Sequence, residues 1–269
     1  MTGEYMKNEK IIRAFNECGI YELAFAKTEN LTVTKEYLLP KEMQTAIVFL
    51  IPYYTGNADG NISLYARAED YHFVAKEISE KVISVLSAEY PKAHFANFAD
   101  HSPIAECEAA AKLSLGVIGK NHLLINKRYG SFVFVSTLFC DIDCDYDEIR
   151  EIKTCLCCGK CEKACPTKAL SSNDMKTCLS YITQKKGELS EFELKAVKES
   201  KTVWGCDICQ LSCPMNKNIE ITPLDVFNKN RIESLYLETL ENMTDEEFNK
   251  RAFSFRGKTP LIRNLKLQK

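Results

Sequence analysis

Residues 155–166 read Cys-Leu-Cys-Cys-Gly-Lys-Cys-Glu-Lys-Ala-Cys-Pro, which spaces Cys155, Cys158, Cys161 and Cys165 as C-x2-C-x2-C-x3-C-P. In proteins with two iron–sulfur clusters, the first three thiolates of such a run bind one cluster and the fourth binds the other. Two-residue spacers let successive thiolates surround three corners of a cubane, whereas the cysteine before the proline faces away from them. This stretch therefore predicts a bacterial-type ferredoxin-like fold around two [4Fe-4S] clusters.

A second cysteine run supplies the ligands that the first one lacks. Cys206, Cys209 and Cys213 precede Pro214 in the spacing C-x2-C-x3-C-P, and Cys178 stands alone between the two runs. The crossing of ligands between clusters predicts two sets of four. The sets are Cys155, Cys158, Cys161 and Cys213 for one cluster, and Cys165, Cys178, Cys206 and Cys209 for the other. Structural zinc is the alternative, since paired cysteines also form four-thiolate zinc sites, but zinc does not require this spacing.

The remaining cysteines are not in register with either run. The chain has 13 cysteines among 269 residues. Clustered cysteines in a long chain indicate metal ligands in a reducing compartment rather than a disulfide framework. We expect the other five to be packed or incidental thiols: Cys18, Cys107, Cys140, Cys144 and Cys157.

The overall composition excludes several classes of protein. Hydrophobic residues make up 45% of the chain and charged residues 27%, which excludes wholesale disorder and fibrous structure. The net charge of −2 gives no general attraction to nucleic acid or to acidic membranes. The longest apolar stretch, residues 45–54, is shorter than the roughly 20 residues that a membrane-spanning helix needs. Residues 1–10 are polar and lack a signal core, so we expect a cytoplasmic protein without a membrane segment.

The front half predicts a mixed α and β core. Apolar periodicity and β-branched runs indicate helices over about 7–18 and 70–89, and strands over about 20–26, 46–54 and 94–98. Ser102 and Pro103 favour the start of a helix that ends at Gly116. The runs 122–126 and 131–139 flank a turn and predict a β-hairpin.

The composition changes near residue 147, where an acidic stretch precedes the cysteine-rich region. We predict three parts: residues 1–147 as a catalytic domain, 148–218 as the double-cluster domain, and 219–269 as a helical segment. Its end, residues 249–269, contains Lys and Arg but no Asp or Glu. The fold class is therefore α+β, with a mixed α/β domain followed by a ferredoxin-like domain that carries two [4Fe-4S] clusters.

Several motifs taken together resemble the epoxyqueuosine reductase family, which is related to the reductive dehalogenases. The cysteine runs continue into Thr167–Leu170, Cys178–Thr183 and Gly205–Pro214, as in the double-cluster domain of that family. The stretches ahead of them that resemble its active-site blocks are Ser63–His72, Asp100-x2-Pro103-x2-Glu106, Gly116–Asn121 and Gly130–Val133. The likeness extends over roughly residues 10–266.

The resemblance implies a cobalamin-binding front domain, in which the nucleotide loop is displaced from the cobalt, and two clusters that reduce the cobalt. The family reaction removes the epoxide oxygen of epoxyqueuosine in tRNA and gives queuosine. An opening epoxide leaves an alkoxide that needs a proton, so the reaction requires a positioned acid. Asp100 matches the family's proton donor. The structural alternative for Asp100 is a loop carboxylate or a helix cap.

The resemblance also implies contacts to the cobalamin from six further residues. They are Lys120, Asn121, Ser131, Ser180, Thr183 and Asp207. Lys120 and Asn121 could instead close a helix, and the two serines and Thr183 could be ordinary turn or strand residues.

Typical members of the family continue beyond the counterpart of residues 259–264 into a helical-repeat extension that helps to hold tRNA, whereas this sequence ends at Lys269. We therefore interpret the chain as a short form. Its basic end either binds phosphates or forms a solvated, frayed terminus. The expected partners are tRNA and an external one-electron donor such as a flavodoxin or ferredoxin. Two other functions stay open: a cobalamin-dependent reductase of a small molecule, and a two-cluster electron-transfer protein without its own catalysis.

Overall fold

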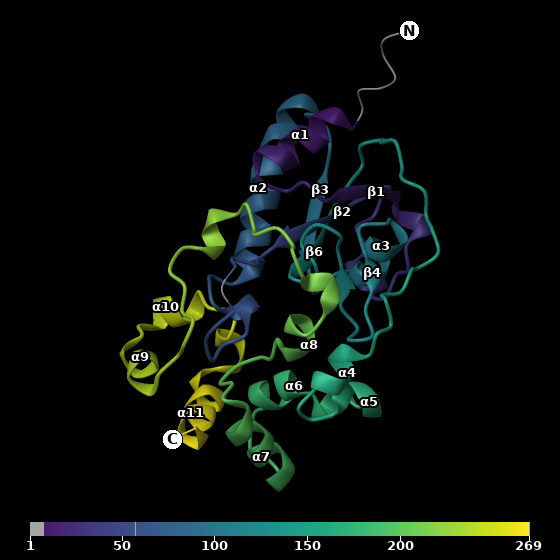
Figure 1. Cartoon of the computed structure of the whole chain (residues 1–269). Coiled ribbons are helices and arrows are strands. Elements are labelled where there is room, and N and C mark those ends of the chain that lie inside the picture. Colours follow the sequence, from purple (N-terminus) through teal and green to yellow (C-terminus); the bar gives the residue numbers. More distant parts are fainter. Residues whose placement is uncertain (1–7, 57, 269) are drawn as a thin grey trace. The chain divides into compact units, whose positions relative to one another are not determined.

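The structure, a computed structural model, describes residues 8–56 and 58–268 (Figure 1). Two compact units are present: Met1–Pro52 with His72–Cys155, and Tyr53–Tyr71 with Leu156–Lys269. The second unit contains most of the predicted parts 148–218 and 219–269, together with a segment from the front half. The functions predicted for the three parts stay predictions. Lys7, the first residue of the helix predicted over 7–18, and Lys269 of the basic end lie outside the described residues.

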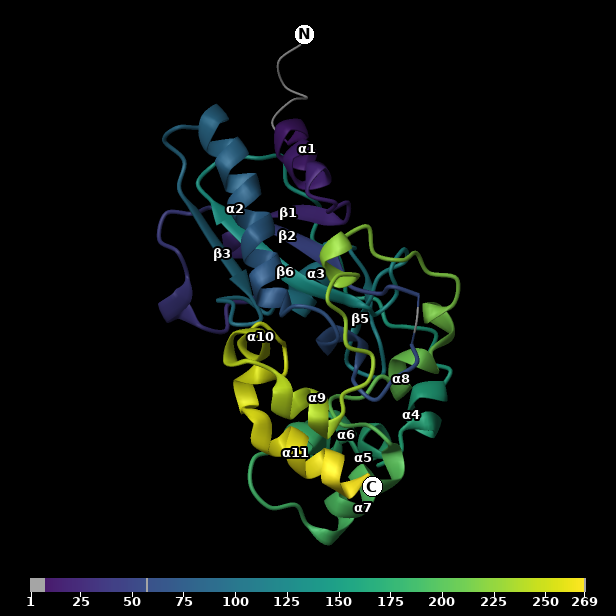
Figure 2. The same cartoon turned by 90° about the vertical axis from the view of Figure 1, so that its left-hand side faces the viewer.

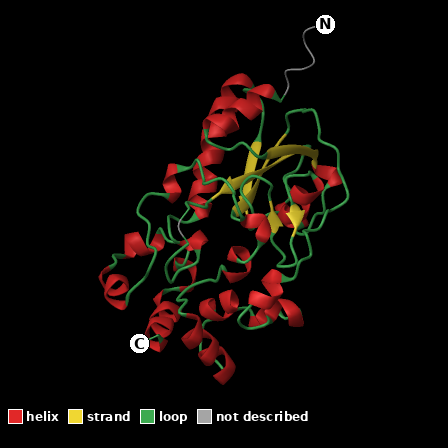
Figure 3. Cartoon of the chain, viewed as in Figure 1, coloured by secondary structure: helices red, strands yellow, loops and turns green. Residues whose placement is uncertain are grey.

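The first unit contains a four-stranded antiparallel sheet (Figure 3). Its strands, in spatial order, are β1 (Leu23–Lys27), β2 (Thr45–Pro52), β6 (Val133–Cys140) and β3 (Phe95–Ala99). A separate short ladder joins β4 (Val117–Ile118) to β5 (Leu124–Ile125). The helices of this unit are α1 (Glu9–Glu17), α2 (Tyr71–Glu89) and α3 (Glu106–Lys112). The mixed α+β class is confirmed.

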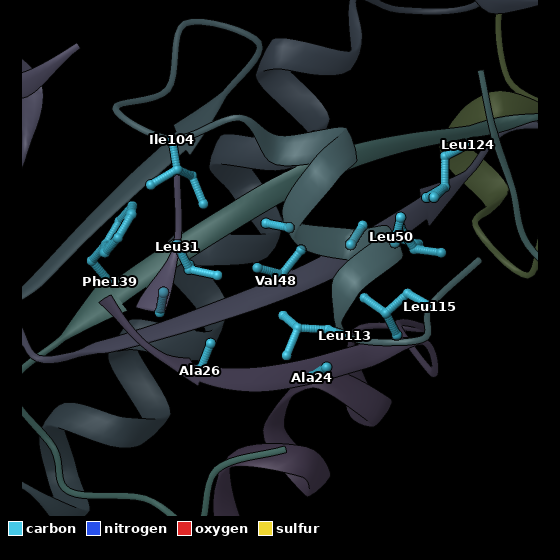
Figure 4. Close-up of a cluster of buried hydrophobic side chains, with 14 residues drawn as sticks. Ala24, Ala26, Leu31, Val48, Leu50, Ile104, Leu113, Leu115, Leu124 and Phe139 are labelled. Carbon is cyan, nitrogen blue, oxygen red and sulfur yellow. The ribbon is translucent and has the colours of Figure 1, made fainter. Parts of the chain in front are cut away.

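Alternation along the strands divides the sheet into two packed faces. Ala24 and Ala26 of β1, with Val48 and Leu50 of β2, point toward α3 and form one core (Figure 4). The three consecutive alanines of α3, residues 109–111, are all buried and let this short helix approach the sheet closely. On the other face, Phe15 of α1 contacts Phe49 of β2 with 4.9 Å between the ring centroids. Because both faces of β2 are covered, all eight of its residues are buried.

The predicted start of the third helix at Ser102 is wrong. Pro103 lies in an extended segment, where its carbonyl accepts hydrogen bonds from the backbone N–H groups of Thr34 and Lys35. Ile104 forms a bridge with Val33, so the chain is held as a strand-like connection until Ala105. The helix also ends at Lys112, before Gly116, since Ser114 already takes a positive φ of 63°. Tertiary hydrogen bonds thus override the local capping preference.

The predicted hairpin of residues 122–126 and 131–139 is also wrong. The backbones of Asn126 and Gly130 do close a tight turn with hydrogen bonds of 2.9 and 3.0 Å. The chains then separate, because β5 pairs with β4 while β6 pairs with β2 and β3. The eight-residue β6 forms hydrogen-bonded ladders along both of its edges, with β2 and with β3, which a local hairpin would not provide.

The second unit is built from short helices (Figure 2). They are α4 (Lys160–Ala164), α5 (Ala169–Ser172), α6 (Leu179–Gln184), α7 (Glu191–Ser200), α8 (Ile208–Leu211), α9 (Leu237–Asn242), α10 (Asp245–Asn249) and α11 (Lys258–Leu267). Short 3-10 helices of this unit lie at Leu64–Ala66, Met175–Thr177, Pro214–Asn216, Asp225–Phe227 and Ser254–Arg256, and two more, in the first unit, lie at Thr28–Asn30 and Glu36–Leu38. Trp204 is fully buried in the core of this unit, and its indole N–H donates to the Tyr65 hydroxyl at 2.9 Å.

The basic end is a packed helix, so the alternative of a frayed terminus is wrong for the described residues. Arg263 of α11 donates to the backbone carbonyls of Lys185 and Gly187 at 2.8 and 2.9 Å. Asn264 is fully buried and donates to the carbonyls of Thr183 and Val203, both at 2.8 Å. Among the described helices, none is long and apolar enough to cross a membrane.

Candidate functional site

Asp100 lies on a turn that directly follows β3, and its side chain is exposed. Its backbone takes a left-handed conformation with φ of 62°, which Asp tolerates better than most residues. The Asp100 N–H donates to Oε2 of Glu106 at 2.9 Å, and the N–H of His101 donates to the carbonyl of Ala99 at 2.7 Å. The turn is therefore fastened both to the strand before it and to the first turn of α3.

Glu106 is the hydrogen-bond partner of Asp100, a role that the sequence motif alone does not predict. Burial raises the pKa of Glu106 to about 8, although hydrogen bonds from the Asp100 N–H, Thr137 and Ser102 counteract this. The Thr137 hydroxyl is 3.3 Å from Glu106 Oε1. Glu106 consequently carries a proton at neutral pH while its carboxyl oxygens accept hydrogen bonds. The signal in the sequence was a glutamate that directly precedes the alanine-rich part of a short helix, residues 106–112.

The segment after α3 contains a buried amide with unused hydrogen-bonding capacity. Asn121 is 6% exposed, and its Nδ2 has no hydrogen-bond partner among the described residues. A Cβ at Gly119 would lie 2.3 Å from Asn121 Oδ1, so a side chain there would displace the amide. Of the other predicted contacts in this unit, Lys120 is exposed and Ser131 is buried. A buried amide donor of this kind suits a ligand with carbonyl oxygens, such as the amide groups around a corrin.

In the second unit, Asp207 ties the cluster segment to residues 63–64. It is buried and accepts hydrogen bonds from the Ser63 hydroxyl at 2.6 Å, the Leu64 N–H at 2.7 Å and the Gln210 amide at 3.1 Å. Burial raises the pKa of Asp207 against these hydrogen bonds. Gly205 allows the two segments to approach, since a Cβ there would lie 2.4 Å from Ser63 Cβ. Whether Asp207 also contacts a cofactor stays a prediction.

Ser180 and Thr183 lie on α6 of the same unit. Thr183 is fully buried; its hydroxyl donates to the Ser180 carbonyl at 2.9 Å and accepts from the Gly205 N–H at 3.0 Å. The Ser180 hydroxyl accepts from the Gln184 amide at 3.1 Å. Both hydroxyls thus have partners within the protein, and their predicted contact with cobalamin stays a prediction.

The eight predicted cluster ligands all lie on or beside short helices of the second unit or at its border. Helix α4, which carries Cys161, packs against α8, which carries Cys209 (Figures 1 and 2). Burial raises the pKa of Cys206 to about 12, and the nearby thiols of Cys209 and Cys178 contribute to this shift. Cys178 and Cys209 therefore both lie close to Cys206. This fits the predicted second set.

Cys165 shows how the backbone prepares a ligand. Burial would raise its pKa, but N–H groups of Leu170, Thr167 and Ala169 and the Thr167 hydroxyl lower it below the ordinary value for a thiol. The Thr167 hydroxyl is 3.8 Å from Cys165 Sγ. Donors aimed at the sulfur favour the thiolate, which is the form that binds iron. Across residues 8–56 and 58–268, the side chains of His, Cys, Asp and Glu form no group of three that would hold a single metal ion.

The cysteines outside the two sets occupy different surroundings. Burial raises the pKa of Cys140 to about 11 and that of Cys144 to about 12, as for inert packed thiols. Cys157 is exposed and has a positive φ of 51°, between two predicted ligands.

Two protein families match parts of the chain. Residues 154–216 match the family described as "4Fe-4S double cluster binding domain". Residues 35–101 match the family described as "Epoxyqueuosine reductase QueG, DUF1730". The first match identifies the region as a double [4Fe-4S] cluster domain and supports the iron–sulfur interpretation of the cysteine runs over zinc.

Curated proteins of the same name are similar over long stretches. An epoxyqueuosine reductase from Cyclobacterium marinum is 36% identical over 199 residues, which cover 70% of this chain and 61% of that protein. One from Cellulophaga algicola is 31% identical over 279 residues, which cover 92% of this chain and 90% of that protein. The chain thus spans about three fifths of the length of some relatives and nine tenths of another.

Solved structures share the fold. The epoxyqueuosine reductase of Streptococcus thermophilus has a TM-score of 0.80 at 25% identity, and the match covers 97% of this chain and 80% of that one. An epoxyqueuosine reductase solved with an epoxyqueuosine-modified tRNA-Tyr stem loop has a TM-score of 0.77 at 22% identity, over 98% of this chain and 81% of that one.

Proposed function

Because this chain belongs to the epoxyqueuosine reductase family, we propose that it reduces epoxyqueuosine to queuosine in tRNA. The similarity over nine tenths of the Cellulophaga algicola protein is the observation that carries the proposal. The reaction consumes two electrons and two protons, breaks both C–O bonds of the epoxide, and releases its oxygen as water. The two clusters supply the electrons one at a time. Since tRNA is the substrate, the proposed location is the cytoplasm.

We propose Asp100 as the group that gives a proton to the oxygen of the opening epoxide. Its exposed carboxyl can reach a substrate, and the fastened turn fixes where that carboxyl starts. A proton donor must come within hydrogen-bond distance of the atom that receives the proton, so the position of this turn matters as much as the acid itself. In the Bacillus subtilis enzyme, an aspartate loop described as catalytic is swung out of the active site, which supports a loop of this kind that moves.

We propose cobalamin as the resident cofactor of the active site. When bound, it supplies a reduced cobalt that passes the electrons of the clusters to the substrate. The buried Nδ2 of Asn121, without a protein partner in the described chain, is the donor that best fits its amide groups. Lys120, Ser131, Ser180, Thr183 and Asp207 remain the further proposed contacts.

The cluster ligands are proposed as the two crossed sets. Cys155, Cys158, Cys161 and Cys213 hold the first cluster, and Cys165, Cys178, Cys206 and Cys209 hold the second. The effect of Cys209 and Cys178 on the pKa of Cys206 supports the grouping of these three cysteines in the second set.

The proposed partners are tRNA and an external one-electron donor such as a flavodoxin or ferredoxin. The tRNA stem loop bound to the structural relative supports the first. The basic end offers fewer phosphate contacts than its sequence indicates, because the guanidinium groups of Arg263 and Arg251 donate hydrogen bonds to backbone carbonyls. Lys250, Arg256 and Lys266 remain at or near the surface.

The decisive experiment uses protein whose clusters and cobalamin have been reconstituted. It is supplied with a chemical reductant and an epoxyqueuosine-containing tRNA stem loop, and the nucleosides are analysed by mass spectrometry. Conversion to queuosine is the expected result. Bound cobalamin without conversion would favour a small-molecule substrate, and failure to bind cobalamin would favour an electron-transfer protein; either result contradicts the proposal.

A further inference from the structure

The surface around the first cysteine run exposes both apolar and basic side chains. We name five of these residues the entry face: Leu156, Lys160, Lys163, Lys168 and Leu211. All five lie in the second unit, and α4, which carries two of the lysines, packs against both α5 and α8 (Figures 1 and 2). Lys160 and Lys163 are three residues apart and so share a helix face. The ammonium group of Lys168 lies 3.5 Å from the carbonyl of Lys163.

The two leucines of the entry face are unusually exposed for their type. Leu156 is 69% exposed and Leu211 is 49% exposed. Single exposed apolar residues are common on protein surfaces and need no explanation by themselves. These two, however, flank ligands of one proposed cluster, because Leu156 follows Cys155 and Leu211 precedes Cys213 by two residues.

The predicted ligands of the two sets differ in their exposure. Cys158 of the first set is exposed, and its three companions are partly exposed. The second set includes the buried Cys165. The first set therefore presents the more exposed ligands to a protein that approaches from outside.

The charge of the entry face selects the kind of partner. Residues 156–172 contain three lysines and one glutamate, Glu162, a net charge of +2. The segment 208–218 beside α8 adds Lys217 and no acid. A basic patch on a chain of net charge −2 attracts an acidic protein locally and orients it as it approaches. Electron-transfer complexes use small interfaces, and protein interfaces generally combine apolar side chains with polar or charged ones at the rim.

We propose that the entry face is the docking surface for a small acidic one-electron carrier protein, which delivers electrons to the first cluster. The proposal rests on the proposed function only for the fate of the electrons. It commits to an acidic protein donor. The chemistry is one electron from the donor to the first cluster per encounter, which oxidises the donor and reduces the cluster.

The test is the reduction of the clusters, followed by absorbance in a stopped-flow instrument. The protein carries both clusters, and a reduced flavodoxin is the probe. K160E/K163E should lower the second-order rate constant for reduction by flavodoxin by about tenfold or more at low salt. Reduction by dithionite, a small reductant that needs no docking surface, should stay unchanged. The wild-type rate should fall as salt rises, and the variant rate should depend on salt much less.

A matched control reverses two exposed lysines elsewhere in the same unit. K195E/K198E on α7 changes the net charge equally and should leave the flavodoxin rate within twofold of the wild type. Equal flavodoxin rates for K160E/K163E and the wild type would overturn the proposal, as would an equal loss in the α7 control. K168E changes a lysine that follows the first cysteine run, and a lower flavodoxin rate for this variant gives the same answer if K160E/K163E binds less iron.

This measurement needs neither tRNA nor cobalamin. A protein that accepts electrons at the entry face but converts no epoxyqueuosine would contradict the proposed function alone. A protein that converts epoxyqueuosine while K160E/K163E accepts flavodoxin electrons normally would contradict the entry face alone.

Discussion

Asp100 combines an exposed carboxyl with a backbone conformation that few residues adopt readily. Its φ of 62° is tolerated by Asp and Asn because their short side chains bond locally in this region. Asn is therefore a clean replacement that keeps the turn and removes the acid. The identity of this residue can be tested without disturbing the fold around it.

We expect D100N to lower the rate of epoxyqueuosine conversion by about 100-fold or more, since general acids contribute roughly that factor. Reduction of the clusters by dithionite should not change, because no proton from Asp100 is needed there. The measurement is single-turnover conversion of a stem-loop substrate beside the absorbance of the clusters. Wild-type conversion by D100N would remove Asp100 from the mechanism.

Glu106 holds the same turn by accepting a hydrogen bond from the Asp100 N–H. Glutamine keeps a neutral carbonyl acceptor of the same length, whereas leucine keeps the volume and offers no acceptor. We expect E106Q to retain most of the activity. E106L should lower kcat with little change in KM, because the carboxyl of Asp100 would no longer be held in position. Faster hydrogen exchange of the Asp100 amide in E106L, and not in E106Q, would accompany the loss. Equal behaviour of the two variants would count against a positioning role.

The ionisation of Glu106 also gives a dependence on pH whose sign is fixed. Its pKa is raised from an ordinary value of about 4.3 to about 8, so the folded protein favours the protonated form. The stability from this group is complete below about pH 4.3 and is lost as the pH rises through 8. Relative to E106Q, the wild-type free energy of unfolding should fall between pH 5.5 and 7.5 by at most about 1.4 kcal/mol per pH unit, and by less where solvent reaches the carboxyl. Urea unfolding of both proteins at several pH values measures this, and parallel curves would contradict it.

At the scale of elements, helix α11 closes the second unit from the C-terminal side. Its Asn264 amide satisfies two buried carbonyls, and Leu261 and Leu265 pack into the core of that unit. We expect N264A to lower the free energy of unfolding by about 2–5 kcal/mol, because two acceptors lose their donor in a buried place. K266A, an exposed change on the same helix, should stay within about 0.5 kcal/mol of the wild type. Thermal unfolding of both variants checks this, and similar small losses would show that α11 is only loosely attached.

The sequence predicted those elements whose pattern is local and strong. The predicted bounds of the long α2 and the buried β2 agree with the structure to within a few residues. Apolar residues recur at helical spacing along α2, and β2 is an almost unbroken apolar run. The hairpin failed because β6 pairs with distant strands, and pairing of distant strands leaves no local pattern. The predicted helix start at Ser102 is wrong because the backbone of the next two residues pairs with Val33 and Thr34 instead of turning into a helix.

The candidate site divides along the same line. The cysteine runs were legible because cluster ligands follow fixed spacings, and the matching family confirms the double cluster. Glu106 was not recognised as a partner of Asp100, since its role depends on a hydrogen bond to a turn and on burial by the sheet. The anchoring role of Asp207 likewise requires Ser63, which is 144 positions away in the sequence.

At the scale of the whole molecule, the two units differ in what holds them together. The first has a four-stranded sheet with a continuous core on one face, which includes Val48, Leu50 and Phe139. The second has one apolar core around Trp204 and a second, smaller cluster of four buried residues beside α6 and α7. Its cluster segments consist of helices of four to six residues, too short to be stable by themselves. We therefore expect the eight proposed thiolate–iron bonds to supply much of the order of these segments.

Removal of the clusters tests this division of labour. Treatment with a chelator and an oxidant should greatly increase amide hydrogen exchange in residues 156–178 and 205–214, where ligands replace an apolar core. Strands β2 and β6 should keep their protection, because their ladders and their packing belong to the first unit. Helix α11 should be affected less than α4 and α8, since Leu261 and Leu265 pack into the apolar core around Trp204. Exchange followed by mass spectrometry, with and without clusters, resolves these segments. Loss of protection in β2 and β6 equal to that in α4 and α8 would show instead that the clusters stabilise the whole chain as one cooperative structure.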